Sequence, residues 1–101
     1  MWLIVMFDLP TDTRDARQSY AAFRKQLLQD GFYQVQYSVY ARPCPSRENA
    51  TVHVNRVERS LPPAGEVRIL KITDKQFERM GIFCGKKRTK QGVTPGQLQL
   101  F

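Results

Sequence analysis

Residues 2–9 read WLIVMFDL, an apolar run that Asp8 closes and Pro10 follows. A short continuous run of aliphatic, β-branched and aromatic residues is typical of a buried strand, and the proline ends it. The run is too short to cross a bilayer, which takes about 20 apolar residues. We therefore expect a core strand of a cytosolic protein without a membrane segment, and the chain of 101 residues has the size of one domain.

Two amphipathic helices are predicted on either side of a second strand region. The first lies within residues 11–31, where Thr11 or Thr13 can cap its start and Gly31 its end. The second runs from the capping residue Ser46 to about Leu61. Apolar side chains recur at i, i+4, i+7 and i+11 in both, which places them on one stripe: Ala16, Tyr20, Phe23 and Leu27, then Ala50, Val54, Val57 and Leu61.

The remaining periodic segments are strands. Residues 32–42, FYQVQYSVYAR, are aromatic and β-branched, and they form either one bent strand or a very short hairpin. Residues 66–73, EVRILKIT, form a further strand. The order predicts an α+β fold of the ferredoxin-like, split β-α-β type, with both helices on one face of a sheet. The other face is left for a second subunit or for nucleic acid.

The C-terminal part is different in character. Four cations occupy five positions, Lys86, Lys87, Arg88 and Lys90, and the chain ends in QLQLF, where Leu98 and Leu100 alternate as in a strand. We expect residues 1–84 to form the domain and residues 85–101 to form a basic linker with a C-terminal strand. That strand suits addition to the sheet edge of another subunit. A frayed basic tail is the alternative.

The chain is strongly basic, with a formal net charge of +7. A compact domain of this charge attracts polyanions and releases their counterions on contact. Arginine side chains fork onto phosphate oxygens, so the candidates for binding nucleic acid are Arg14, Arg17, Arg24, Lys86, Lys87 and Arg88. Pairing of Arg14 and Arg17 with Asp12, Asp15 or the solvent is the alternative. A second, weaker basic face would consist of Arg42, Arg47, Arg56 and Arg59.

Few other residues are of a type that reacts or binds a metal. The two cysteines, Cys44 and Cys84, form no C-x-x-C pair and lack companions for a zinc site, so both are expected to be reduced. His53, the one histidine, is expected on the surface of the second helix without a catalytic role.

Several separate motifs resemble CRISPR-associated protein 2: FDLP at the end of the first strand, the TDTRDAR helix start and DGFYQVQYSVY. The later stretch RVERSLPPAGEVRILKITDKQF is similar to the variant found in type II systems. The resemblance covers about residues 2–84. It implies a ferredoxin-like fold and a symmetric homodimer in which the C-terminal strand, with Leu98 and Leu100, pairs with the sheet of the other subunit. It also implies a role beside the CRISPR-associated protein 1 integrase in capturing double-stranded DNA as new spacers.

The same resemblance implies a role for Asp8. Family members are described as metal-dependent endonucleases, acting on RNA or double-stranded DNA, and the aspartate that ends the first strand is their metal-binding and catalytic residue. The preceding residue, commonly tyrosine, is Phe7 here. Asp8 is the one acid of the first strand, so two copies would have to share one Mg²⁺ across a dimer axis. The alternative role is to cap the following helix or to form a hydrogen bond with the loop.

Three classes of function follow. The favoured one is a dimeric DNA-binding adaptor that uses phosphate contacts, which need cations but no sequence-reading residues. The second is a nuclease centred on Asp8, including a toxin-type ribonuclease of the same fold. The third is a single-stranded RNA-binding module, whose aromatic signature stretch the sequence lacks.

Overall fold

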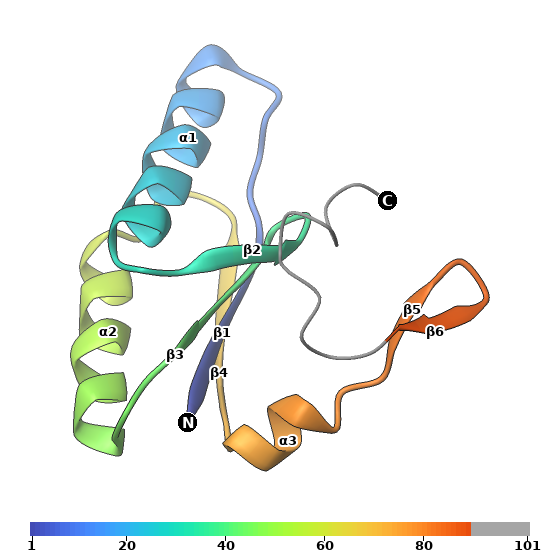
Figure 1. Cartoon of the computed structure of the whole chain (residues 1–101). Helices are drawn as coiled ribbons and strands as arrows, with labels where there is room; N and C mark the ends of the chain where they lie inside the picture. The colour runs from blue at the N-terminus through green and yellow to red at the C-terminus, as the bar shows by residue number, and fades with distance from the viewer. Residues whose placement is uncertain (90–101) are drawn as a thin grey trace.

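The computed structural model describes residues 1–89, and it confirms the α+β, ferredoxin-like fold (Figure 1). The strands of the main sheet and its helices alternate along the chain as β1 (Trp2–Asp8), α1 (Arg14–Gln29), β2 (Tyr33–Gln36), β3 (Val39–Pro43), α2 (Arg47–Arg59) and β4 (Glu66–Ile72). The 4-stranded sheet has the order β2-β3-β1-β4, and every neighbouring pair is antiparallel. After β4 come α3 (Asp74–Glu78), β5 (Ile82–Cys84) and β6 (Lys87–Thr89).

The ends of the helices follow the capping chemistry that the sequence predicts. The Thr13 side chain accepts a hydrogen bond from the Ala16 amide at 3.0 Å, and the Ser46 side chain accepts one from the Asn49 amide at 3.0 Å. Gly31 follows α1 with a φ of +85°, a left-handed conformation that glycine adopts without strain. Leu61 was predicted on the buried stripe of the second helix. This is wrong, because α2 ends at Arg59 and Leu61 is 48% exposed.

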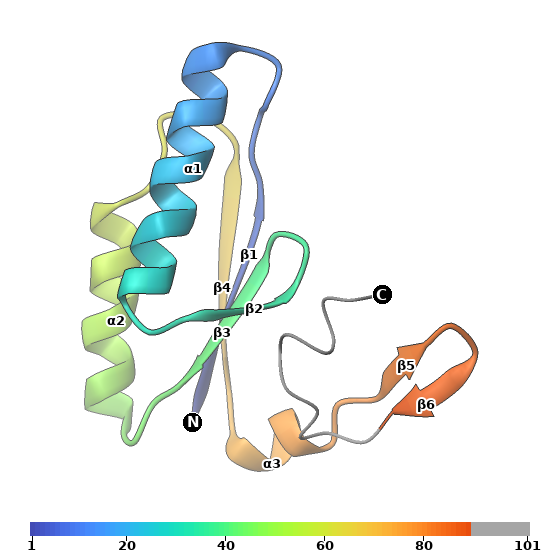
Figure 2. The same ribbon diagram turned by 45° about the horizontal axis from the view of Figure 1, so that its top comes forward.

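One face of the sheet is covered by α1 and α2, which lie side by side (Figure 2). Alternate residues of the central strand β1, Leu3, Val5 and Phe7, point toward these helices. They form the main core with buried side chains of both helices and of β3: Phe23, Leu27, Tyr40, Ala50 and Val57. The choice between one bent strand and a hairpin in residues 32–42 is resolved as the hairpin of β2 and β3.

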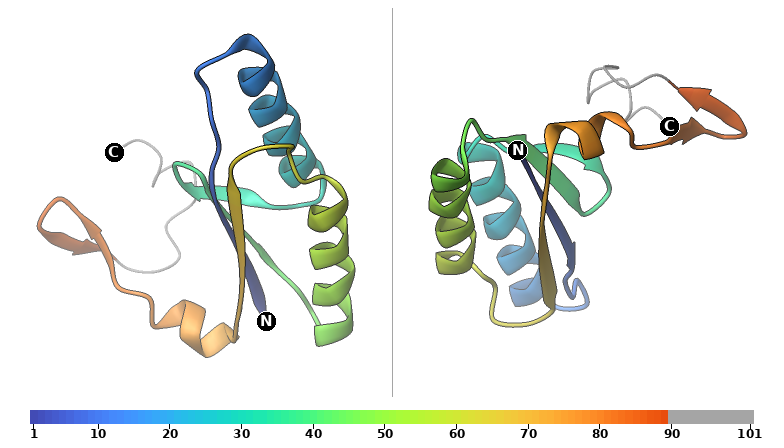
Figure 3. Two further views of the ribbon diagram at one scale, coloured as in Figure 1. Left: turned by 180° about the vertical axis from the view of Figure 1, so that it is seen from behind. Right: turned by 90° about the horizontal axis from the view of Figure 1, so that it is seen from below.

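The opposite, open face of the sheet is only partly covered. Phe77 of α3 stacks on Trp2 with ring centroids 3.7 Å apart, and it buries Ile4 and Ala41 beneath it. The rest of this face lacks a covering helix, as the view from below shows (Figure 3). Leu70 of β4 pairs with Ile4 and is 47% exposed. The end of β1 that carries Asp8 belongs to this uncovered part.

The chain continues from α3 into the β5–β6 hairpin, a 2-stranded sheet of its own. Gly85 lies in its turn with a φ of +67°, so the expected domain boundary after residue 84 falls inside the hairpin turn. The division into residues 1–84 and 85–101 stays a prediction. Leu98 and Leu100, the residues of the expected C-terminal strand, lie outside the described residues. Within residues 1–89, no helix has the length and apolar character needed to cross a membrane.

Candidate functional site

Asp8 is the last residue of β1 and lies on the open face of the sheet. Its side chain is exposed, whereas Phe7 before it is buried under α1. The alternative that Asp8 caps the first helix is wrong, because Thr13 supplies that cap. Within residues 1–89 the Asp8 carboxylate makes no side-chain hydrogen bond or ion pair. It is therefore available to a ligand on the open face.

Glu66 is the residue of this site that the sequence reasoning missed. It begins β4 and pairs with Asp8 in the antiparallel β1–β4 ladder. Directly opposite residues of such a ladder point to the same face, with their Cβ atoms about 5 Å apart. The Nε atom of Arg68 lies 2.5 Å from Oε1 of Glu66. The alternation of β4 places Glu66 on one face with Leu70 and Ile72, but only the register of pairing brings it beside Asp8.

Gly65 makes this close approach of the two strands possible. A Cβ atom added there would lie 2.7 Å from the carbonyl oxygen of Asp8 and 2.7 Å from the side chain of Leu9. Its φ of +94° is also a conformation that other residues rarely adopt. The turn before β4 therefore has to be glycine, and this glycine sets Glu66 against the end of β1.

The donor chemistry of Asp8 and Glu66 fits Mg²⁺, which prefers hard carboxylate oxygens and keeps several waters. Within residues 1–89, no group of three or more histidine, cysteine, aspartate or glutamate side chains could hold a metal ion. One chain thus offers two carboxylates, one more than the sequence suggested. Water or a second chain would have to complete the coordination of a metal ion.

The predicted phosphate-binding cations fall into two groups. Arg14 and Arg17 lie on the first turn of α1, just after the loop that follows Asp8, and both are exposed. Arg17 donates to the carbonyl of Thr11 at 3.1 Å. Within the described residues neither arginine forms an ion pair with Asp12 or Asp15, and both are exposed to solvent, so their role in binding nucleic acid stays a prediction.

The second group of cations lies on the β5–β6 hairpin, away from the first. Lys86, Lys87 and Arg88 are all exposed. The guanidinium of Arg88 lies 5.8 Å from the ring centroid of Phe83, itself 59% exposed. The hairpin follows α3, which begins beyond the end of β4 that pairs with Trp2, whereas Asp8 pairs at the other end. The structure thus does not bring these cations together with Asp8 within one chain.

Comparison with known proteins assigns the fold to a family. The family model described as CRISPR associated protein Cas2 matches residues 1–80. The chain belongs to this family. A relative from Parvibaculum lavamentivorans, named CRISPR-associated endoribonuclease Cas2, is 59% identical over 101 residues and covers 100% of both chains. A relative of the same name from Flavobacterium psychrophilum is 50% identical over 101 residues, which are 100% of this chain and 88% of that one.

A solved structure supports the Cas2 fold independently. The crystal structure of Streptococcus pyogenes Cas2 at pH 6.5 matches with a TM-score of 0.63, covering 83% of this chain and 100% of that chain. The sequence identity of this pair is 19%, so the likeness concerns the fold alone. In this member of the Cas2 family, Asp8 therefore ends the first strand of a fold shared across distant sequences.

Two arginines of the weaker predicted basic face, Arg42 and Arg56, are engaged in contacts within the protein. Arg42 is half-buried and donates to the backbone carbonyl of Asp30, and Nη1 of Arg56 lies 2.8 Å from Oδ1 of the same residue. His53, expected on the helix surface, is 5% exposed, and its Nδ1 lies 2.8 Å from Oδ2 of Asp30. Because a carboxylate only accepts, Nδ1 of His53 donates this bond. The surface prediction for His53 and Arg42 was wrong.

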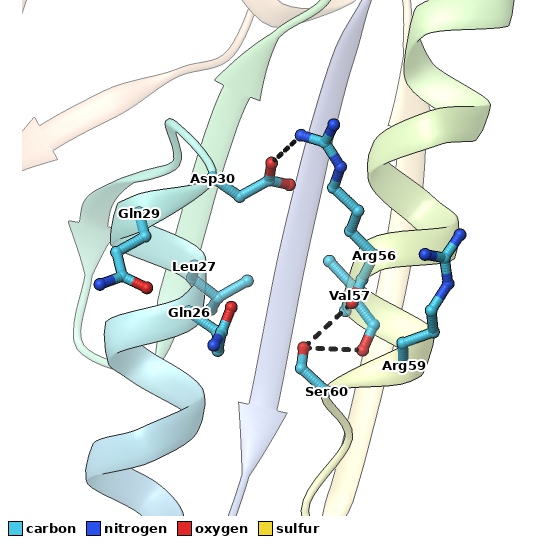
Figure 4. Close-up of a pocket in the computed structure, with 8 residues that line it drawn as sticks. All are labelled: Gln26, Leu27, Gln29, Asp30, Arg56, Val57, Arg59 and Ser60. Atoms are coloured by element: carbon cyan, nitrogen blue, oxygen red, sulfur yellow. Dashed lines mark hydrogen bonds and ion pairs between the residues drawn. The ribbon is translucent and has the colours of Figure 1, made fainter.

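These contacts border a cavity of about 380 Å³ between the end of α1 and α2 (Figure 4). Arg56 reaches from α2 across to Asp30, which caps the end of α1, and the Ser60 hydroxyl donates to backbone carbonyls of α2. Asp30 thus connects α1 to α2 and, through Arg42, to β3. We interpret this cluster as structural, since its cations are already paired.

Proposed function

We propose that this member of the Cas2 family is a cytoplasmic, homodimeric DNA-binding adaptor of CRISPR adaptation, working with the CRISPR-associated protein 1 integrase. One observation carries the proposal: a net charge of +7, with several exposed cations that have no acidic partner within residues 1–89. Arg14, Lys86 and Lys87 form no ion pair within residues 1–89. Cations that are not neutralised locally release the counterions of duplex DNA when they contact its phosphates.

The open face of the sheet supports the homodimer. Ile4, Met6 and Val39 lie on it, and Leu70 is exposed there although an apolar side chain gains by leaving water. A second copy in this position would bring two Asp8 side chains toward one axis. We further propose that Leu98 and Leu100 pair with the sheet of the other subunit. Deleting residues 93–101 should then lower dimer stability, and an unchanged dimer that still joins the integrase would exclude the pairing.

The adaptor is tested by the salt dependence of DNA binding. Affinity for duplex DNA should fall steeply between about 50 and 200 mM salt, with a log–log slope of about −0.9 for each phosphate contacted. Unrelated duplex sequences should bind equally well, because phosphates carry no sequence information. A single-stranded RNA of equal length serves as the competing ligand. A flat salt response would exclude the adaptor, and a strong preference for the RNA would favour an RNA-binding module.

A second candidate function is a Mg²⁺-dependent endonuclease centred on Asp8. The position of Glu66 opposite Asp8 favours it, as does the name endoribonuclease carried by the relatives. Asp8 and Glu66 would hold the ion, which would activate water and offset charge on the phosphate. Arg14 and Arg17, on the adjoining helix turn, would orient the nucleic acid backbone. Cleavage of single-stranded RNA or duplex DNA by the purified chain, lost with EDTA, would establish this activity.

A further inference from the structure

Three tyrosines gather around Phe7, the residue that precedes Asp8. The ring of Tyr20 on α1 meets Phe7 edge-on with centroids 5.8 Å apart, and Tyr40 of β3 stacks on it at 5.6 Å. Tyr37 lies in the β2–β3 turn, which is attached to the same place because the Phe7 amide donates to the Ser38 carbonyl at 3.1 Å. Elements distant in sequence thus bring three phenol rings to one edge of the sheet.

The Tyr40 hydroxyl in this cluster is buried and lacks an acceptor for its own proton. Tyr40 is 0% exposed, and its hydroxyl oxygen makes no hydrogen bond of normal geometry. A buried hydroxyl without a partner costs stability, and phenylalanine would fill nearly the same space without that cost. The guanidinium of Arg24, on the next turn of α1 after Tyr20, lies beside this hydroxyl. Arg24 can donate a hydrogen bond to this oxygen, but no acceptor for the proton of the Tyr40 hydroxyl lies within reach in residues 1–89.

The electrostatics of the cluster suit an anion. Burial raises the pKa of Tyr40, with an opposing influence of Arg24, and a hydrogen bond with Tyr20 raises the pKa of Tyr37. Both phenols therefore remain protonated at neutral pH and can donate. Arg24 forms no ion pair within residues 1–89. The cluster thus combines hydroxyl donors with one positive charge.

We propose that Arg24, Tyr20, Tyr37 and Tyr40 form a subsite for one phosphate group of the bound nucleic acid backbone. This inference rests on the proposed function, because it supplies a specific phosphate contact for it. Arg24 provides the charge and the hydroxyls provide donors, as phosphate oxygens require. Tyr37 is 80% exposed, so its ring can move outward and admit a phosphate oxygen to the Tyr40 hydroxyl. The phosphate supplies the acceptor that the proton of the Tyr40 hydroxyl lacks within residues 1–89 of the free protein.

The test compares Tyr40→Phe and Arg24→Gln with the control Tyr33→Phe. Tyr33 lies on the open face, with its ring edge-on to Trp2 at 6.1 Å, outside the cluster. Each of the two cluster variants should lower duplex DNA affinity about tenfold, the size of a lost charge-assisted hydrogen bond. Arg24→Gln should also reduce the salt slope by about 0.9, whereas Tyr40→Phe, which removes no charge, should leave it unchanged.

Two further measurements are needed. One shows whether the variants act on binding or on folding, and the other shows whether the site also takes free phosphate. Tyr40→Phe should keep or raise the melting temperature, because it removes an unsatisfied buried hydroxyl, whereas a merely structural hydroxyl would lower it. Inorganic phosphate, compared with chloride at equal ionic strength, should shift the NMR signals of Arg24 Nε–H and of the Tyr37 amide. The same titration should give no such shift in Arg24→Gln and a weaker one in Tyr40→Phe.

The outcomes distinguish this inference from the proposed function. If the wild-type chain binds duplex DNA and both cluster variants bind equally well, the subsite is excluded and the adaptor stands. If the wild type does not bind DNA but phosphate shifts the cluster signals, the adaptor falls and the site takes free phosphate. If neither ligand binds, both proposals are overturned.

Discussion

Asp8 and Glu66 lie directly opposite each other at the last pair of the β1–β4 ladder, two carboxylates on the open face of the sheet. Like charges in this position repel, which destabilises the pair of strands in the absence of a cation. Arg68 offsets part of this charge through its contact with Glu66, while Asp8 has no such partner within residues 1–89. A bound cation would therefore stabilise this pair of strands by offsetting the repulsion.

We expect Mg²⁺ to raise the melting temperature of the wild-type chain, because the ion binds the folded state at Asp8 and Glu66. Asp8→Asn and Glu66→Gln should each abolish this increase. Asp8→Asn should also raise the melting temperature without metal, by about 2–4 °C, because one of two facing charges is removed, whereas Glu66→Gln should raise it less because the ion pair with Arg68 is lost too. Differential scanning fluorimetry with and without Mg²⁺ measures both effects. Asp12→Asn, in the loop before α1, is the matched control and should respond to Mg²⁺ like the wild type.

Asp8→Asn also separates the adaptor from the enzyme. We expect the variant to fold, to dimerise and to support spacer integration by the integrase, because DNA binding depends on cations elsewhere. Any Mg²⁺-dependent cleavage by the purified chain should disappear, since asparagine lacks the charge that a hard cation requires. Parallel integration and cleavage assays on one preparation measure this. Loss of integration by a well-folded variant dimer would contradict the adaptor.

Gly65→Ala should destabilise the fold by more than about 2 kcal/mol, because it combines a positive φ with a clash against the Asp8 carbonyl. Gly85→Ala is the control, with a φ of +67° and open space where its Cβ would lie. This variant should cost only about 1 kcal/mol, from the backbone conformation. Urea unfolding measures the difference. Equal costs would mean that the contact with Asp8 does not fix the start of β4.

Asp30→Asn should destabilise the chain by about 1–3 kcal/mol, because the buried His53 and the cation of Arg56 lose a charged acceptor. The Asp30 side chain is 11% exposed and that of Arg56 is 56% exposed. Arg56→Ala should therefore cost less than about 1 kcal/mol, as for other exposed ion pairs. Denaturant unfolding of both variants measures which of the two substitutions destabilises the chain more. A larger loss of stability in Arg56→Ala would show that Arg56, and not His53, provides most of the stability of this cluster.

Arg14→Ala should weaken duplex DNA binding equally on all sequences and reduce the salt slope by about 0.9. Its stability should change little, since the Arg14 side chain forms no hydrogen bond or ion pair within residues 1–89. Arg17→Ala should weaken binding similarly but also lower stability slightly, because the contact with the Thr11 carbonyl is lost. Lys87→Gln tests the hairpin in the same assay. Unchanged slopes in all three variants would place the DNA on another surface.

The order of the elements from β1 to β4 could be predicted from the sequence because its signals are local, whereas α3 and the β5–β6 hairpin were not predicted. Thr13 and Ser46 cap helices through side chains that reach only three residues along the chain, and Gly31 ends α1 through its own backbone freedom. The continuous apolar run of residues 2–7 predicted β1 as a buried strand without knowledge of any partner strand. Asp8 could likewise be placed at the end of its strand, but its face could not be predicted, because the apolar run before it shows no alternation.

What the tertiary structure decided was which distant residues meet. Glu66 lies beside Asp8 because of the β1–β4 register, and the sequence of either strand alone does not contain that register. His53 is buried because Asp30, at the end of another helix, offers it a carboxylate, so its polar character was a misleading sign of exposure. The sequence by itself determined the elements and the positive charge, since these follow from neighbouring residues and composition. The sites required the fold, because each depends on side chains that only packing and strand pairing bring together.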